Sequence, residues 1–252
     1  MKGRVRRMQW AFLIGFLLLV GFVSVGWPRK TVDHSLYGEL LAKYVTDGVV
    51  DYKAFKREED TLDQYLRMLD GTNPEELLRN EQLALYINAY NAYTIKLILE
   101  HYPVDSIKDI GGWFKGPWKI RFCKIGGKTL TLDEIEHDII RPRFKDPRVH
   151  FAVNCASKGC PPLISKPYQG PILDQQLDRS ARSFLNNRER NRLEGSTLSV
   201  SKIFKWFEGD FDGDVVAFFL KYAEGDLKDR LVAKRDQIEI EYLHYDWRLN
   251  GK

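Results

Sequence analysis

Apolar residues recur every three or four positions through much of the chain, the spacing of helices that bury one face. The clearest case is 80–102, "NEQLALYINAYNAYTIKLILEHY", which Pro103 stops. Shorter helical patterns come before and after it, and we expect helices at 34–45, 54–70, 132–141, 173–190 and, in two pieces, 201–223. The pattern therefore predicts a chain rich in helix.

The predicted strands are short and lie mostly in the second half of the chain. Two apolar-rich runs within 118–132 flank Gly126-Gly127, which predicts a β-hairpin. Further extended pieces are expected at 49–52, about 148–154, 197–201 and 237–243. This order lacks βαβ regularity, so we predict one α+β domain over 35–250, with helices packed on a mainly antiparallel sheet.

A continuous apolar run stands near the N-terminus of the chain. Residues 10–27 carry no charge, and four basic residues stand in the flank 1–9 before them. This pattern is typical of a transmembrane anchor or a cleaved export signal, and both alternatives stay open. The positive-inside rule sends the domain across the membrane, with 28–34 as a tether. In a bacterium the domain would be periplasmic, anchored to the inner membrane or released by cleavage.

Charge gives little reason to expect a nucleic-acid partner. The net charge is +4, and the four basic residues of the N-terminal flank account for it. No compact stripe of Lys and Arg interleaved with aromatic residues is visible, so we expect no nucleic-acid binding.

Two of the three cysteines stand close together in 148–163, "RVHFAVNCASKGCPPL". Cys155 and Cys160 could form a disulfide in an oxidising compartment, or Cys155 could be a nucleophile, with Cys160 structural or a resolving thiol. Zinc binding with His137 and His150 is disfavoured, because this spacing fits no common zinc site; no metal is predicted. The C-x4-C spacing also disfavours a thiol-redox protein.

Strand alternation over 148–154 would separate the histidine from the cysteine. His150 and Asn154 would share one face and Cys155 the other, so we expect His137 to be the better base. Asn154 and the loop amides after Cys155 could bind an oxyanion.

The helix expected from Leu132 starts with a capping box made by Thr131 and Glu134. Glu136 falls on its buried apolar stripe, and His137 on the flank of that stripe. A buried carboxylate needs a partner, so one interpretation pairs Glu136 with Arg141. The other places this helix face as an acid/base wall of a cleft.

Asn88 and Asn91 lie on one side of the long helix, although asparagine is a poor helix former. Their side chains are expected to bind another segment of the chain or a substrate. The "DFDGD" at 210–214 lacks the glycine and glutamate of a calcium loop, so we interpret it as a loop and helix cap.

Several long motifs together resemble a known family, the domain of unknown function 547. They are "YINAYNAYTI", "LDEIEHDIIRPRF", "VHFAVNCASKGCPPL", "IFKWFEGDF" and "YDWRLN", in that order over about 35–250. The resemblance implies a fold similar to papain-like cysteine peptidases and transglutaminases, with a Cys-His-Glu constellation. On matching positions these would be Cys155 as nucleophile, His137 as base and Glu136 as the acidic member, with His150 able to supply a further contact.

The sequence therefore favours a membrane-anchored, cysteine-dependent hydrolase or acyl transferase acting on an amide, peptide or thiol-containing substrate without a cofactor. The alternative is a non-catalytic binding or scaffold module with a structural Cys155–Cys160 disulfide.

Overall fold

A computed structural model describes residues 30–112 and 116–251 and confirms a mixed α+β domain. The predicted apolar segment 10–27, its flank and the first two residues of the tether lie outside the described residues. Within the described ranges, no helix has the length and apolar character needed to cross a membrane.

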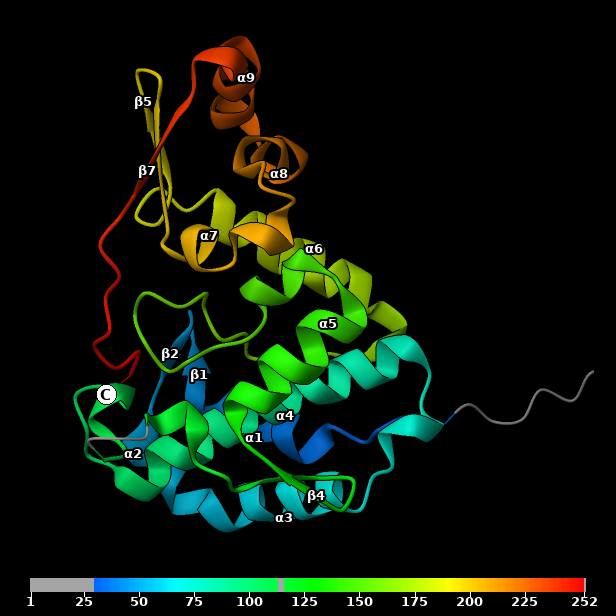
Figure 1. Cartoon of the computed structure of the whole chain (residues 1–252). Coiled ribbons are helices and arrows are strands. Elements are labelled where there is room, and N and C mark those ends of the chain that lie inside the picture. The colour runs from blue at the N-terminus through cyan, green and yellow to red at the C-terminus, as the bar shows by residue number, and fades with distance from the viewer. Residues whose placement is uncertain (1–29, 113–115, 252) are drawn as a thin grey trace, which may run out of the picture.

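The lower part of the molecule in Figure 1 is mostly helical. Its helices are α1 (Ser35–Tyr44), α2 (Tyr52–Phe55), α3 (Glu59–Asp70), α4 (Arg79–His101) and α5 (Arg141–Phe144). The long helix α4 confirms the strongest prediction from sequence, and its side chains from Glu81 to Leu99 are nearly all buried. It is therefore the central helix of this part, and α3 packs along it.

Two small antiparallel hairpins accompany these helices. One pairs β1 (Val45–Thr46) with β2 (Val49–Val50), and the other pairs β3 (Cys123–Ile125) with β4 (Lys128–Leu130). The second hairpin turns at Gly126 and Gly127, as predicted, and both glycines have positive φ.

The upper part combines the remaining helices with a three-stranded sheet (Figure 1). Its helices are α6 (Leu173–Leu185), α7 (Ile203–Trp206), α8 (Val215–Tyr222) and α9 (Gly225–Ala233), and its strands are β5 (Arg192–Glu194), β6 (Thr197–Val200) and β7 (Glu239–Tyr242). The sheet order is β5-β6-β7. The β5–β6 pair is antiparallel, but β6 and β7 are parallel, which the sequence did not indicate.

Each part has its own apolar core. One core is built on α4 and its neighbours, and the other gathers phenylalanines around Phe151 and Phe204. The C-terminal segment runs back from β7 along the edge of the molecule and joins the two parts (Figure 1). Gly251 bridges to Val50, and Leu249 bridges to Ser157.

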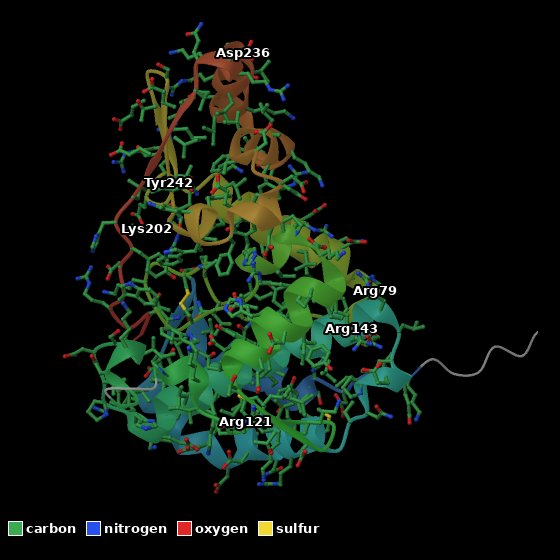
Figure 2. All side chains as sticks on the ribbon, in the orientation of Figure 1. Arg79, Arg121, Arg143, Lys202, Asp236 and Tyr242 are labelled. Carbon is green, nitrogen blue, oxygen red and sulfur yellow. A yellow bond between two sulfur atoms is a disulfide. The ribbon has the colours of Figure 1, made fainter. Side chains whose placement is uncertain are left out.

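Charged side chains project outward from both parts. Figure 2 shows Asp236 at the tip of the upper part and Arg79 and Arg143 at the right of the view. These charged side chains surround the two apolar cores.

Candidate active site

A cavity of about 240 Å³ lies where the two parts meet. Its lining comes from α4, the helix after Leu132, the loop that holds the cysteines, α7 and the C-terminal segment. The predicted site residues that it brings together are Glu136, His137, His150, Cys155 and Cys160. Its other lining residues are Tyr90, Trp118, Asp133, Val153, Pro161, Ile203, Trp206, Phe207, Tyr245 and Trp247.

The segment that carries His150 is not a strand. The strand predicted at 148–154 is wrong, because the 3-10 helix Pro147–Phe151 occupies most of this stretch. Asp146 caps this helix and Pro147 is its first residue, a combination that favours a helix start. The predicted separation of His150 and Cys155 by strand alternation is therefore also wrong, and both residues line the same cavity.

His150 is held firmly within the upper core. It is only 2% exposed, and its ring stacks on Phe207 with 4.0 Å between ring centroids. Its Nε2 atom lies 2.6 Å from Oδ2 of Asp210. Because an ionised carboxylate only accepts hydrogen bonds, Nε2 carries a proton, and in the neutral ring Nδ1 is then the atom with the lone pair. The Nδ1 atom is buried and has no hydrogen-bond partner among the described residues.

Asp210 is the acidic residue that the sequence interpretation missed. It also accepts hydrogen bonds from Nε of Arg141, at 2.6 Å, and from Nη2, at 3.1 Å. The hydrogen bond from His150, together with those from Arg141, holds the pKa of Asp210 well below its usual range. Asp210 stands in both "DFDGD" and the family motif "IFKWFEGDF", so the motif was the available signal.

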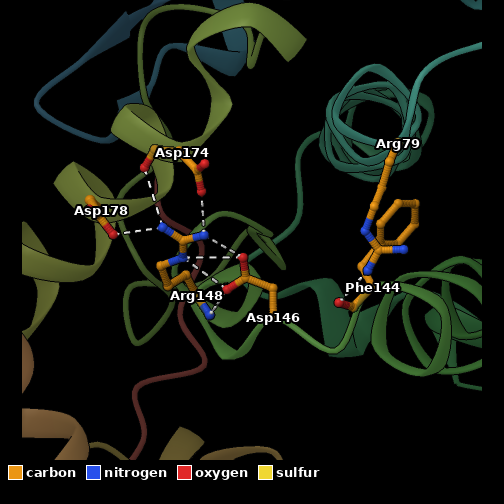
Figure 3. Close-up of polar contacts among 6 residues, drawn as sticks. All are labelled: Arg79, Phe144, Asp146, Arg148, Asp174 and Asp178. Carbon is orange, nitrogen blue, oxygen red and sulfur yellow. Dashed lines mark hydrogen bonds and ion pairs between the residues drawn. The ribbon is translucent and has the colours of Figure 1, made fainter.

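An ion-pair network fixes the backbone beside His150 from the outside. Figure 3 shows the guanidinium of Arg148 between Asp146, which caps the same 3-10 helix, and Asp174 and Asp178 of α6. The shortest contacts to these three carboxylates measure 2.6, 2.7 and 2.7 Å. The network therefore ties the His150 segment to α6.

Glu136 is buried, as its place on the apolar stripe predicted, with an exposure of 8%. The predicted capping box at Thr131 and Glu134 is confirmed, although the helix that follows is a π-helix over Glu134–Ile140. The pairing of Glu136 with Arg141 is wrong as a hydrogen bond, since Arg141 binds Asp210 and His137 instead.

His137 is considerably more exposed than His150, with a side-chain exposure of 39%. Its Nδ1 atom lies 2.8 Å from Nη1 of Arg141. A guanidinium only donates hydrogen bonds, so this lone pair of His137 is already engaged. Its Nε2 atom faces Asp133, at 3.8 Å.

Cys155 and Cys160 form a disulfide, with 6.2 Å between their Cα atoms. The hydroxyl of Tyr245 lies 3.4 Å from Sγ of Cys155 and 3.2 Å from Sγ of Cys160. The hydroxyl of Ser157 is 3.3 Å from Sγ of Cys155. The third cysteine, Cys123, is free and buried, and burial raises the pKa of its thiol. The sequence had left the disulfide open as one of two alternatives.

The loop that contains the disulfide is also held by Asn154. Its Nδ2 donates to the carbonyl of Pro161, at 2.7 Å, and its Oδ1 accepts from the amide of Ala156, at 2.9 Å. Ala156 has a φ of +58°, a strained conformation for a residue with a Cβ atom. The Asn154 side chain is thus committed to shaping the loop and does not line the cavity around Cys155.

Asn88 and Asn91 bind backbone groups of other segments. Asn88 donates to the carbonyl of Tyr168, at 2.8 Å, and accepts from its amide, at 2.9 Å. Asn91 donates to the carbonyl of Ala152, at 2.9 Å, and accepts from the amide of Asn154, at 2.8 Å. Neither asparagine lines the cavity, and substrate contact by them stays a prediction.

The arrangement offers the parts of a nucleophilic site rather than a metal centre. In the described ranges, no group of three or more His, Cys, Asp and Glu side chains is placed to hold a metal ion. The cavity is lined by a sulfur pair, by a histidine that a carboxylate orients and whose Nδ1 has no partner in the described part of the chain, and by Tyr245, whose hydroxyl lies beside the sulfurs.

The family model described as "Protein of unknown function, DUF547" matches residues 74–185. The matched stretch contains α4, the π-helix, His150 and both cysteines of the disulfide, while Asp210 and Tyr245 lie beyond it. No curated protein and no solved structure matches the chain. The resemblance seen in the sequence is thus confirmed as a family-model match over residues 74–185.

Proposed function

We propose that this protein is a cysteine-dependent hydrolase or acyl transferase that acts on amide or peptide-like substrates. Cys155 is the nucleophile, His150 its base, and Asp210 the residue that orients His150. The observation that carries the proposal is the pairing of the buried His150 with Asp210. The Nδ1 atom of His150 has no partner in the described part of the chain, and His150 lines the same cavity as Cys155.

This assignment replaces the histidine and the acid that the family resemblance implied. The Nδ1 lone pair of His137 is engaged by Arg141, whereas the Nδ1 atom of His150 is free to accept a thiol proton. Glu136 and His137 then form part of the cavity wall beside the reacting groups. A papain-like architecture is part of the proposal, supported by a cysteine, a histidine and an acid that meet at the junction of two packed parts.

The disulfide must open before Cys155 can react. A dithiol reductant would attack Sγ of Cys160, which also lines a second cavity of about 510 Å³. The S–S bond breaks, Cys155 leaves as the thiolate, and the second thiol of the reductant releases Cys160. The two electrons come from the dithiol, which becomes a disulfide.

In the reduced protein, Nδ1 of His150 takes the proton of Cys155, and the thiolate attacks the carbonyl carbon of the amide. In this proposal Tyr245, whose hydroxyl lies 3.4 Å from Sγ of Cys155, donates a hydrogen bond to the oxyanion, and burial raises its pKa to about 12, which keeps the hydroxyl protonated. The imidazolium of His150 then protonates the departing amine as the C–N bond breaks. Water, or a second amine, attacks the thioester with His150 as base, and the C–S bond breaks.

Export through the apolar segment 10–27, as an anchor or a cleaved signal, is also part of the proposal. Its support is that a disulfide persists more readily outside the cytosol. The thiol is then under redox control in the compartment where the protein works.

A matched pair of variants tests the proposal. In the reduced full chain, the rate of Cys155 alkylation by iodoacetamide is measured from pH 5 to 9 with peptide mapping, for the wild type, His150→Ala and His137→Ala. We expect His150→Ala to slow alkylation at pH 7 by about tenfold or more and His137→Ala to leave the profile nearly unchanged. The reverse result would assign the base to His137, and an ordinary thiol profile in the wild type would reject the nucleophile.

One observation favours a second candidate, a non-catalytic binding module, because the disulfide itself is present in the structure. This alternative predicts that a reduced chain forms no thioester. Incubation of the reduced protein with a mixture of activated peptide esters, followed by mass spectrometry of the peptide containing Cys155, separates the two candidates. An acyl adduct on Cys155 supports the enzyme, and its absence with an unactivated thiol supports the binding module.

A further inference from the structure

We propose that the cavity beside Cys155 binds a cationic amino group of its ligand, so that the substrate is an amide with a free amine close to the bond attacked. The substrate assignment rests on the proposed function, whereas amine binding by the cavity can be tested without it.

The first argument is a buried carboxylate in the wall of the cavity that no ion pair neutralises. Glu136 is only 8% exposed, and it forms no ion pair with any residue of the described ranges. A buried carboxylate is costly unless a cation or hydrogen-bond donors compensate it. The nearest candidate in sequence, Arg141, is committed to Asp210 and His137. A hydrogen bond with Tyr90 compensates Glu136 in part, and a cationic group of a ligand could neutralise it.

A second carboxylate, Asp133, lines the same cavity one helical turn before Glu136. Its one ion-pair contact in the described part of the chain is to Nε2 of His137, at 3.8 Å. The described residues that line the cavity include no lysine or arginine. The lining thus combines two acids with no fixed positive charge, and it favours a positively charged ligand over a negatively charged one.

The third argument is the group of aromatic residues that lines the same cavity as these acids. Tyr245 packs between Trp206 and Trp247, with ring centroids 4.7 and 4.6 Å from its own. Ring faces attract cations, and aromatic walls with nearby carboxylates bind ammonium groups well. The same aromatic group already holds one cation, since the ammonium of Lys108, which does not line the cavity, lies 4.1 Å from the ring centroid of Trp247.

Access and size fit a small cationic group. Trp206 is 45% exposed, which is high for a tryptophan, and the cavity holds about 240 Å³. That volume lies below the usual range of about 300–1,000 Å³ for pockets of drug-sized ligands, and it suits a group on the order of one amino-acid residue. His150, which also lines the cavity, adds a buried Nδ1 atom that has no hydrogen-bond partner among the described residues. An amine bound by Glu136 would lie in the same small space as the reacting sulfur.

The first experiment measures the electrostatic preference at Cys155 directly. In a full-chain Cys160→Ser background, Cys155 is reacted with three methanethiosulfonates of similar size that carry a 2-aminoethyl, a 2-hydroxyethyl or a 2-sulfonatoethyl group. The measured quantity is the ratio of the rate constants for the cationic and the anionic reagent. We expect this ratio to be at least about tenfold higher for Cys155 than for a small free thiol. The gain should shrink as salt is added.

Matched variants separate the cavity charge from the general charge of the protein. Glu136→Gln and Asp133→Asn should each bring the ratio several-fold closer to that of the free thiol. Glu208→Gln removes an exposed acid that follows the cavity residue Phe207 but does not line the cavity, and it should leave the ratio unchanged. Equal ratios in the wild type and Glu136→Gln would overturn the proposal, and so would the neutral reagent reacting fastest, which would indicate an apolar site.

The second experiment does not depend on the thiol. Binding of L-alaninamide and of its neutral isostere L-lactamide to the full-chain Cys155→Ser variant is measured by calorimetry. We expect tighter binding of the amine by about tenfold and loss of this difference in Cys155→Ser/Glu136→Gln. If Cys155 proves unreactive, the proposed enzyme function fails while this titration still decides amine binding; equal affinities for the two amides would reject it.

Discussion

The Nε2 atom of His150 and the Oδ2 atom of Asp210 lie 2.6 Å apart, although the two residues are 60 positions apart in the chain. Asp210 also accepts two hydrogen bonds from Arg141, so its carboxylate is held in place from two sides. This arrangement fixes both the orientation and the tautomer of the His150 ring. The basic Nδ1 atom is therefore positioned by a residue that does not itself line the cavity.

Asp210→Asn should slow Cys155 alkylation in the reduced chain at pH 7 by about tenfold, because an amide stabilises the imidazolium less well and allows the other tautomer. The pH profile of alkylation checks this. Asp212→Asn, an exposed neighbour, is the control and should behave as wild type. An unchanged profile in Asp210→Asn would show that the pair is structural.

Opening the disulfide should cost little stability. The two cysteines are only five positions apart, and a hydrogen bond from Asn154 to Pro161 holds the same loop together. We expect a loss of roughly 2 kcal/mol or less in the free energy of unfolding for Cys160→Ser. Urea unfolding of oxidised wild type and Cys160→Ser measures it.

Asn154→Ala is the companion variant. It leaves the carbonyl of Pro161 and the amide of Ala156 without their buried partners, so we expect a loss of about 2–3 kcal/mol even with the disulfide intact. If Cys160→Ser were the more damaging change, the disulfide would be the main staple of the loop, as the binding-module alternative requires.

Local sequence patterns predicted the elements whose causes are local. The long apolar pattern and Pro103 specified α4, the Gly126-Gly127 pair specified the second hairpin, and Thr131 with Glu134 specified a capping box. Each of these depends on residues within one helix or one turn. They required no knowledge of what packs against them.

The errors arose where distant parts of the chain decide the outcome. The apolar run after Arg148 resembles a strand, but the Asp146-Pro147 start favours a helix, and the aromatic core of the upper part accepts Phe151 in that form. The place of Asp210 and Tyr245 in the site depends on how the upper part and the C-terminal segment pack. The spacing of residues in the sequence does not predict that packing.

Arg148→Met should destabilise the protein by about 2 kcal/mol, because the Arg148 side chain is only 17% exposed and its guanidinium binds three carboxylates (Figure 3). The carboxylates raise the pKa of Arg148, Asp146 most strongly, so the ion pairs persist across the accessible pH range. Arg79→Met is the matched control, since Arg79 is exposed and donates to a backbone carbonyl, that of Phe144. Its expected cost is under about 1 kcal/mol.

Thermal or urea unfolding of the two variants gives the comparison. Equal losses would mean that the Arg148 network adds nothing beyond a surface ion pair. Because the network anchors the segment beside His150, Arg148→Met should also slow Cys155 alkylation several-fold in the reduced chain, and Arg79→Met should not.

His34 should make the folded protein less stable in mild acid. It is 5% exposed, its Nδ1 lies 2.7 Å from the hydroxyl of Tyr65, and burial lowers its pKa to about 4. The unfolded chain, with a pKa near 6.5, binds this proton more readily, so stability is fully present above about pH 6.5 and falls as the pH drops toward 4. The shift in the pKa of His34 contributes up to about 3 kcal/mol to the pH dependence of the free energy of unfolding.

The measurement is the free energy of unfolding in urea at pH 7.0, 5.5 and 4.5, for the wild type and His34→Gln. Glutamine can keep a hydrogen bond to Tyr65 but does not titrate, so its stability should fall less steeply with acid. All other ionisable groups are common to both proteins, and the difference between the two slopes isolates His34. Parallel curves from pH 7.0 to 4.5 would mean that His34 becomes protonated in the folded state as easily as in the unfolded chain.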